Sequence, residues 1–275
     1  MSLSEIVLHV RRPDVPGRAT EAAFAIAHRF EAYVTAVHPV AIAPTAFAAP
    51  EAVALSVVEA SREYADALAK RESWNARFAA AKVAGEWQVV QAEDVEALCR
   101  AARSADLVVV ERPTTPAEAP VGWGIASRTA FSAGVPVLVV PDTARVADRY
   151  DHIVVAYDGG PQATRALHRA VPLLKAAREV VVLNGCPVSS TTGVRHLPLL
   201  DAAAYLSRNE VTAHVQRFDH QGREAGPALL EAARAAGAEC LVMGAWGHSR
   251  IAQLVLGGAT RHLLQHSDVP LFVSH

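Results

Sequence analysis

This sequence runs through one pattern twice, and that repetition constrains its fold more than any other feature. Three pairs of segments match in residue type and follow the same order in both halves: 4–10 with 151–157, 96–110 with 228–242, and 134–141 with 268–274. We therefore predict an internal duplication. The chain of 275 residues suits two domains of about 140 residues each, and we place them at 1–145 and 146–275.

Within each half, short β-branched runs alternate with helical stretches. Such alternation predicts a parallel sheet with helices on both faces, so we expect two tandem doubly wound α/β domains. In the second half the strands are expected at 152–157, 179–184, 211–217, 240–243 and 270–273, and the helices at 163–177, 199–209, 226–236 and 259–265. In the first half the strands are expected at 5–10, 33–37, 87–91, 107–110 and 135–140, with one long second helix from 50 to about 82.

Composition and charge narrow the classes of function. Hydrophobic residues make up 51% of the chain and charged residues 20%, which supports packed cores and argues against general disorder. A nucleic-acid binder usually carries a basic excess or stripe, whereas this chain has 26 basic and 28 acidic side chains. Prolines interrupt the longest charge-free stretch, 32–50, so it does not resemble a membrane span. Neither nucleic acid nor a membrane is expected as a partner.

Two further observations bear on the compartment. Three isolated cysteines do not form a disulfide framework. The N-terminus lacks the layout of a signal peptide. We therefore expect a cytoplasmic protein.

A cluster of glycines follows the fourth strand of the second half. Gly244 and Gly247 are separated by two residues, nine more separate Gly247 from Gly257, and Gly258 and Thr260 follow. Glycines that leave a strand let the backbone turn sharply and approach a ligand closely. A glycine pair at the start of a helix presents free N–H groups and the positive end of the helix dipole, which favour an anion.

Ligands of doubly wound sheets bind beyond the carboxyl ends of the strands, where the strand order reverses. This places a site at the ends of the first and fourth strands. The first strand of the second half ends in Asp158, whose carboxylate can accept a hydrogen bond from a ribose hydroxyl or a base amine. His248 and Ser249 lie in the glycine loop, where they reach either a phosphate or solvent. The alternative is that the glycines only form the turn and let the last helix pack closely on the sheet.

These residues together resemble a tandem universal stress protein over almost the whole chain. In that family the nucleotide-binding pattern after the fourth strand is Gly-x2-Gly-x9-Gly-Ser/Thr, which Gly244, Gly247 and Gly257 match. Asp158 matches the family's aspartate after the first strand, placed near the nucleoside. The resemblance implies Rossmann-like domains and a stress-response protein that binds an adenine nucleotide (ATP, ADP or AMP), with or without Mg²⁺, in its second domain.

The resemblance also implies how the halves associate. Single universal stress domains commonly dimerise through their fifth strands, so the strands expected at 135–140 and 270–273 would pair within one chain as an intramolecular pseudo-dimer. A further homodimer of two chains is left open. So is the protein partner that would read nucleotide binding as a regulatory switch.

One residue departs from the family pattern, because Gly258 stands where nucleotide-binding members have Ser or Thr. The backbone N–H is kept and the hydroxyl is lost. A hydrogen bond to a charged phosphate contributes about 1.5–3 kcal/mol, so the loss would weaken a triphosphate roughly ten- to a hundredfold. Ser249, Thr260, Arg250 or Arg261 could compensate, and AMP or ADP become better candidates.

The first half lacks the motif. Glu-Arg-Pro at 111–113 follows its fourth strand, and Arg-Arg-Pro at 11–13 stands where the second half has Asp158. A proline removes a backbone donor, and the carboxylate of Glu111 would repel a phosphate. We predict no nucleotide site in this half and a structural role as the partner of the second half. Arg11, Arg12 and Arg112 are expected to be solvated at the strand ends, with a small anion patch formed by the three as the alternative.

Other functions are weighed against nucleotide binding. The chain has no Gly-x-Ser-x-Gly turn and no Gly-x4-Gly-Lys-Ser/Thr phosphate loop, and we name no catalytic residue. Slow ATP hydrolysis or autophosphorylation stays open, with Ser249 and Thr260 as acceptors. An interaction or scaffold protein that lost its site at Gly258 is the other alternative. His262 and His266 stand at i, i+4 on one helix but lack a third ligand, so no metal site is expected.

Overall fold

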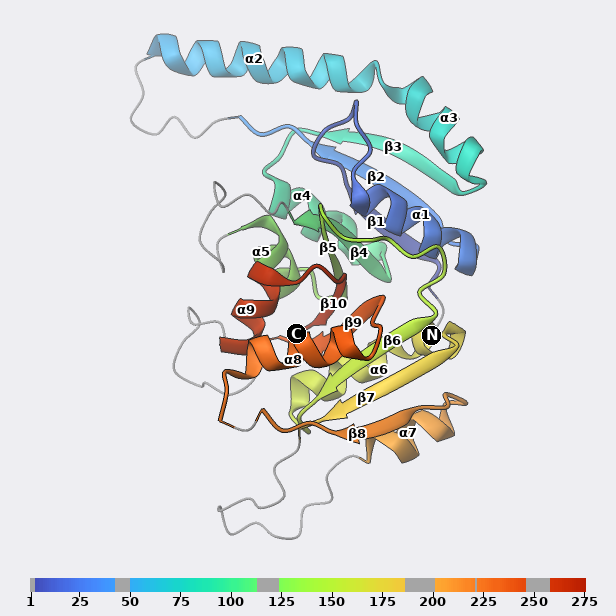
Figure 1. Cartoon of the computed structure of the whole chain (residues 1–275). Helices are drawn as coiled ribbons and strands as arrows, with labels where there is room; N and C mark the ends of the chain where they lie inside the picture. Colours follow the sequence, from blue (N-terminus) through green and yellow to red (C-terminus); the bar gives the residue numbers. More distant parts are fainter. Residues whose placement is uncertain (1–2, 43–49, 113–123, 186–200, 221, 246–257) are drawn as a thin grey trace.

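The computed structural model describes residues 3–42, 50–112, 124–185, 201–220, 222–245 and 258–275. One ten-stranded sheet runs through the molecule (Figure 1). Its strands are β1 (Glu5–His9), β2 (Tyr33–Pro39), β3 (Ala84–Val90), β4 (Leu107–Arg112), β5 (Val137–Pro141), β6 (His152–Tyr157), β7 (Glu179–Asn184), β8 (His214–Arg217), β9 (Cys240–Gly244) and β10 (Leu271–Ser274). The helices are α1 (Arg18–Phe30), α2 (Pro50–Leu68), α3 (Arg71–Ala81), α4 (Asp94–Ala101), α5 (Ile125–Ser132), α6 (Pro161–Ala176), α7 (Ala202–Arg208), α8 (Ala225–Ala235) and α9 (Gly258–His266), with a short 3-10 helix at Ala102–Ser104.

The strand order shows two doubly wound halves joined edge to edge. The order is β3-β2-β1-β4-β5-β10-β9-β6-β7-β8, and neighbouring strands within each half are parallel. Strands β5 and β10 pair antiparallel, with Leu271 opposite Val139 and Val273 opposite Val137. The predicted tandem α/β fold and the pairing of the fifth strands within one chain are confirmed.

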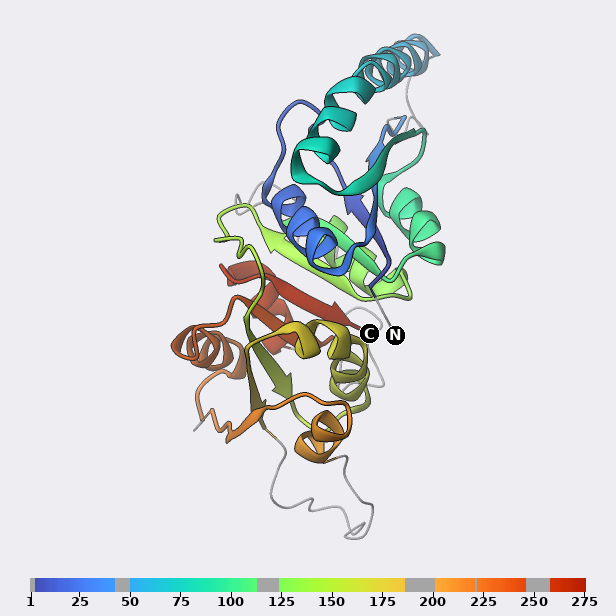
Figure 2. The same ribbon diagram turned by 90° about the vertical axis from the view of Figure 1, so that its right-hand side faces the viewer.

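Helices flank both faces of the sheet in each half (Figure 2). Alternate residues of a strand point to opposite faces, so the buried strands feed two separate apolar cores. One core contains Ile26 of α1, Trp74 of α3, Leu167 of α6 and Leu206 of α7. The other contains Leu98 of α4, Ala130 of α5, Leu230 of α8 and Leu263 of α9. Each core collects side chains from both halves, so the two domains pack as one body.

The duplication extends to single hydrogen bonds. In the first half, the carboxylate of Asp106, before β4, accepts from the backbone N–H of Ser4 at 2.7 Å and of Glu5 at 3.1 Å. In the second half, Glu239, before β9, accepts in the same way from the N–H of Asp151 at 2.5 Å and of His152 at 3.1 Å. An acidic residue before each fourth strand therefore fixes the start of each first strand.

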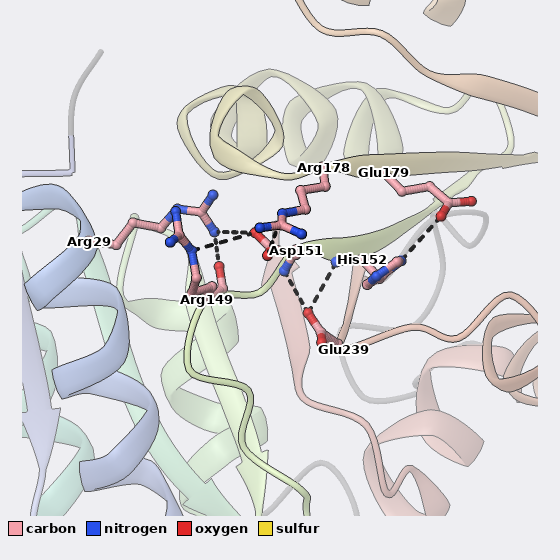
Figure 3. A network of polar contacts seen from close by, with 7 residues as sticks. All are labelled: Arg29, Arg149, Asp151, His152, Arg178, Glu179 and Glu239. Atoms are coloured by element: carbon pink, nitrogen blue, oxygen red, sulfur yellow. Dashed lines mark hydrogen bonds and ion pairs between the residues drawn. The ribbon is translucent and has the colours of Figure 1, made fainter.

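A polar network joins the two halves near the start of β6 (Figure 3). Arg29 of α1 approaches Asp151 at 3.2 Å, and the Nε of Arg178 lies 3.1 Å from the other carboxylate oxygen of Asp151. The Asp151 side chain is 15% exposed, so these contacts are partly shielded from water and fix the connection between β5 and β6. The expected division of domains between residues 145 and 146 lies within this connection and stays a prediction.

The long helix expected from 50 to about 82 is wrong, because two helices, α2 and α3, occupy this stretch. In α3, Trp74 is fully buried and stacks on Trp87 of β3 with ring centroids 4.8 Å apart. Helix α2 buries only Ala60 and Ala67 among its described side chains. The chain breaks between the helices because α3 must tilt its aromatic residues into the core, whereas α2 has no large anchor of this kind.

Strand β8 is shorter than the expected 211–217. The backbone N–H of Val211 donates to the carbonyl of Leu206 at 2.9 Å, so the chain is still closing the end of α7 where a strand was predicted. Within the described residues, no helix is both long and apolar enough to cross a membrane.

Candidate functional site

The strand order reverses between β6 and β9, which are adjacent although they are the first and fourth strands of the second half. At such a point the chain leaves the two strands toward opposite faces, and a crevice forms beyond their carboxyl ends. Asp158 follows β6, and Gly244 is the last residue of β9. Two residues that the sequence singled out therefore stand at this edge of the sheet.

Asp158 is exposed and shapes the turn that leads into α6. Its Oδ1 accepts a hydrogen bond from the backbone N–H of Gly160 at 2.8 Å. Gly159 between them has a φ of 78°, a left-handed conformation that glycine adopts without strain. The sequence Asp-Gly-Gly therefore builds a turn that holds a carboxylate at the surface, beside the end of β9.

Gly244 brings the end of β9 against the first turn of α6. A Cβ atom at this position would stand 2.5 Å from the carbonyl carbon of Gln162 and 2.8 Å from its oxygen. Real Cβ atoms do not approach a backbone this closely, so a larger residue would push β9 and α6 apart. This observation supports a packing role for Gly244, whatever ligand the crevice takes.

Helix α9 begins at Gly258, which is exposed. No atom of the described residues lies within 4 Å of where a Cβ on Gly258 would stand. The first N–H groups of a helix have no partner inside it, so this end of α9 offers backbone donors and the positive end of a dipole. Thr260 lies in the same turn, but only 7% of it is exposed. Its hydroxyl is therefore poorly placed to accept a phosphoryl group.

Four of the predicted site residues, Gly247, His248, Ser249 and Gly257, lie outside the described residues, as does Arg250. The structure therefore places the two ends of the glycine motif and the aspartate. The middle of the motif stays a prediction.

The position of α9 depends on a glycine that sequence reasoning missed. A Cβ on Gly226, in the first turn of α8, would stand 2.5 Å from the Cβ of His262 and 3.2 Å from the Cα of Ala259. The two helices therefore touch near their first turns. The signal that could have found Gly226 in the sequence is a glycine within a predicted helix.

The two histidines of α9 contact each other. The rings of His262 and His266 lie with centroids 4.6 Å apart. Partial burial, and then the neighbouring His266, lower the pKa of His262. Within the described part of the chain, no group of three or more His, Cys, Asp or Glu side chains is arranged to hold a metal ion.

In the first half, Glu111 takes the position that Gly244 has in the second. Ile6 pairs with Leu107, and Ile153 pairs with Cys240 in the same way. Glu111 comes four residues after Leu107 and Gly244 comes four residues after Cys240, so these two residues occupy equivalent positions. The Glu111 carboxylate lies at the start of α1, where Oε2 accepts from the N–H of Ala19 at 3.4 Å. The N-terminus of α1 thus already holds a negative charge, which supports the prediction of no nucleotide site in this half.

Arg112 is only partly solvated, contrary to expectation. Its guanidinium is half-buried and donates to the carbonyl oxygen of Gln265 at 2.7 Å and to that of Ser267. Burial lowers the pKa of Arg112, while the charges of Asp142 and Asp268 act in the opposite direction. A side chain of the first half therefore caps the last helix of the second half.

A further polar pair lies at the carboxyl end of β1. The Nε2 of the fully buried His9 lies 2.8 Å from Oδ1 of Asp94, in the first turn of α4. Burial alone would raise the pKa of Asp94, but the hydrogen bond and charge of His9 outweigh it and lower this pKa. His9 was not among the residues predicted from the sequence, although a histidine at the end of a buried strand is a signal that could have found it. This pair joins a strand to a helix in the half that lacks the glycine motif.

Comparison with known proteins agrees with this geometry. Residues 149–275 match the model of the universal stress protein family. No curated protein matches the sequence. The family match thus covers the half that carries the glycine motif.

Solved structures resemble the whole chain in fold. A universal stress protein from Archaeoglobus fulgidus has a TM-score of 0.71 at 16% sequence identity, over 99% of this chain and 96% of that chain. A functionally unknown protein from Pseudomonas aeruginosa has a TM-score of 0.62 at 13% identity, over 99% of this chain and 92% of that chain. At these identities the likeness concerns the fold alone, and it extends through both halves.

Proposed function

We propose that this chain binds an adenine nucleotide beyond the carboxyl ends of β6 and β9, in the part that matches the universal stress protein family model, residues 149–275. The observation that carries the proposal is the start of α9. There, a helix of the motif half begins at Gly258, and no atom of the described residues lies within 4 Å of where a Cβ on Gly258 would stand. An anion is the ligand that such a helix end favours, and a nucleotide supplies it together with a ring and a sugar.

The residues divide into two groups by the part of the nucleotide that they would contact. The carboxylate of Asp158 would accept hydrogen bonds from the nucleoside, and the Asp158–Gly160 turn already holds it at the surface. Backbone N–H groups at Gly244, Gly247, Gly257 and Gly258 would hold the phosphates. Because these donors belong to the backbone, their charge complementarity does not change with pH.

The residues that are present fit such a ligand. Among the described residues, no atom lies within 4 Å of the Cβ position of Gly258, and Asp158 is exposed at the end of β6. His248 and Ser249 follow Gly247 directly in the sequence, and we place them on the phosphate side. Thr260, in the first turn of α9, would contribute its backbone N–H there, because its side chain is buried. Mg²⁺ would neutralise part of the charge of ATP or ADP, whereas AMP would need less compensation.

We further propose that binding is regulatory. Phosphates that contact both the end of β9 and the start of α9 would tie together the two ends of the segment between them. The surface that this segment presents to a protein partner would then differ between the bound and the free states. We propose that the chain is a cytoplasmic stress-response protein and that nucleotide binding acts as its regulatory switch.

The decisive experiment is to denature freshly purified protein and to analyse the supernatant by chromatography for AMP, ADP and ATP. Calorimetric titration with each nucleotide, with Mg²⁺ or with EDTA, then gives the affinity. We expect one nucleotide per chain at most, and binding that Gly258→Val weakens at least tenfold. Gly124→Val is the matched control, because Gly124 also stands at the start of a helix with open space around its Cβ position.

A second variant at the same position tests the direction of the effect. Gly258→Ser would add a hydroxyl without a clash against the described residues, and one hydrogen bond to a phosphate should tighten binding roughly tenfold. No nucleotide in the purified protein and no heat at millimolar ligand would overturn the proposal.

A ligand-free scaffold is the second candidate, and the packing of Gly244 favours it. Its Cβ position faces the backbone of α6 rather than open space, as expected of a glycine kept for close packing alone. In that case Gly258→Val would leave the protein's interactions unchanged, and added nucleotide would not raise its melting temperature.

A further inference from the structure

Glu111 and Arg112 are adjacent in sequence and have opposite charges. Each side chain lies at the end of a helix whose dipole has the opposite sign. The Glu111 carboxylate lies at the start of α1, which is the positive end of that helix. The Arg112 guanidinium lies at the end of α9, which is the negative end of that helix. Both placements are electrostatically favourable. The contact of Glu111 lies within the first half, whereas the contact of Arg112 reaches into the second half.

Arg112 satisfies carbonyl groups that α9 itself leaves open. The last carbonyls of a helix have no partner within it. Arg112 donates to those of Gln265 and Ser267, which flank the end of α9 at His266. The turn that follows is held by the hydroxyl of Ser267, which donates to the carbonyl of Val269 at 2.7 Å. This end of α9 is thus fixed to β4 of the first half.

We infer that Arg112 is a positioning residue for the nucleotide site, through which the first half sets the placement of α9. Helix α9 has nine residues, so about 13 Å separates its two ends. A rigid element this short transmits a displacement of one end directly to the other. The start at Gly258 is the end that would face the phosphates, so this inference rests on the proposed function.

The contact of Arg112 is not mirrored by the equivalent residue of the second half. Ala245 takes the position in the second half that Arg112 takes in the first, one residue after Gly244. An alanine side chain cannot reach the end of α5. There, Phe131 contacts the ring of His275 at a centroid distance of 4.9 Å. The end of α5 is thus contacted by the ring of His275, whereas the end of α9 is capped by the charged side chain of Arg112.

Three variants of the full chain test this inference: Arg112→Gln, Arg112→Lys and Arg100→Gln. Lysine keeps the charge but replaces the planar fork of donors. Arg100 is the control, since it is an exposed arginine of the first half whose ion pair among the described residues, with Glu96 at 3.8 Å, is also exposed. Melting temperature establishes that each variant folds. Arg112→Lys keeps the test open if Arg112→Gln does not fold.

The first readout is hydrogen exchange of the α9 amides, measured against those of β7 in the same molecule. We expect exchange in α9 to speed up at least fivefold in Arg112→Gln, partly recover in Arg112→Lys, and stay unchanged in Arg100→Gln. Exchange in β7 should not change in any of them. Equal exchange in α9 for Arg112→Gln and wild type would overturn the inference.

The second readout is calorimetric titration with MgATP. We expect Arg112→Gln to weaken binding about five- to tenfold, with a smaller loss in Arg112→Lys. Wild-type affinity in Arg112→Gln would overturn the inference and leave the proposed function intact. Failure of the wild type to bind any nucleotide would overturn both, and the exchange data would then report Arg112 as a structural cap only.

Discussion

Gly244 and Glu111 occupy the same place in the two halves and meet the neighbouring helix in different ways. At Gly244 the backbone of β9 itself touches the first turn of α6. At Glu111 a long side chain reaches the start of α1, and a Cβ on Gly17 would stand only 2.8 Å from its Oε1. A glycine in the strand is thus matched by a glycine in the helix cap of the other half.

The close contact at Gly244 gives a prediction about stability. Gly244→Ala should lower the free energy of unfolding by about 1–3 kcal/mol, because the added methyl group meets the backbone of Gln162 rather than a side chain that can move. Urea unfolding of the full chain measures this. Gly258→Ala is the control and should change stability by less than about 0.5 kcal/mol. Equal stabilities of the two variants would contradict the packing argument.

At the scale of elements, the sequence could predict what local patterns determine. All ten strands of the sheet overlap a strand predicted from the sequence. The β-branched runs mark the inner strands most clearly, because buried parallel strands need such side chains, whereas every residue of the edge strand β8 is exposed. The break between α2 and α3 has no such signal. Lys70, which precedes α3, makes no side-chain cap, and the break follows from the burial of Trp74 instead. Tertiary packing, which local propensity does not report, set this boundary.

The same division holds for the candidate site. Asp158, Gly244 and Gly258 were predicted because they follow or begin recognisable elements. The contacts of Arg112 could not be predicted, since it reaches Gln265 across 153 residues of sequence. Its partners are backbone carbonyls, which every residue possesses and which no sequence pattern marks.

The pair of His9 and Asp94, which joins β1 to α4, predicts how stability depends on pH. The folded pKa of Asp94 lies below its ordinary value of 3.8. Ionised Asp94 therefore stabilises the protein above that value, and this contribution is lost as the pH falls through the lower folded pKa. We expect Asp94→Asn to be less stable than wild type near pH 6, with a difference that shrinks below pH 3.8.

Urea unfolding at several pH values between about 6 and 3 tests this expectation. Glu96→Gln is the control, because Glu96 forms an exposed ion pair with Arg100, and such pairs contribute little. A difference between Asp94→Asn and wild type that stays constant over this range would contradict the argument.

At the scale of the whole molecule, the antiparallel pair of β5 and β10 joins the two halves. Residues 146–275 expressed alone would expose the edge of β10, whose residues are all buried in the full chain. Because a free apolar edge strand tends to pair with another copy, we expect this fragment to form a homodimer. Light scattering after gel filtration measures its mass. A fragment that stays monomeric at tens of micromolar would count against β10 as the main association surface.

The β5–β10 junction has a consequence for stoichiometry. Two separate chains would associate by mass action and come apart on dilution, whereas halves joined by one backbone face each other at a fixed effective concentration. Every molecule therefore contains one half with Glu111 and Arg112 and one half with Gly244. Mixed or symmetric pairings of the two halves do not compete within a chain, so each half is free to specialise without imposing its residues on the other.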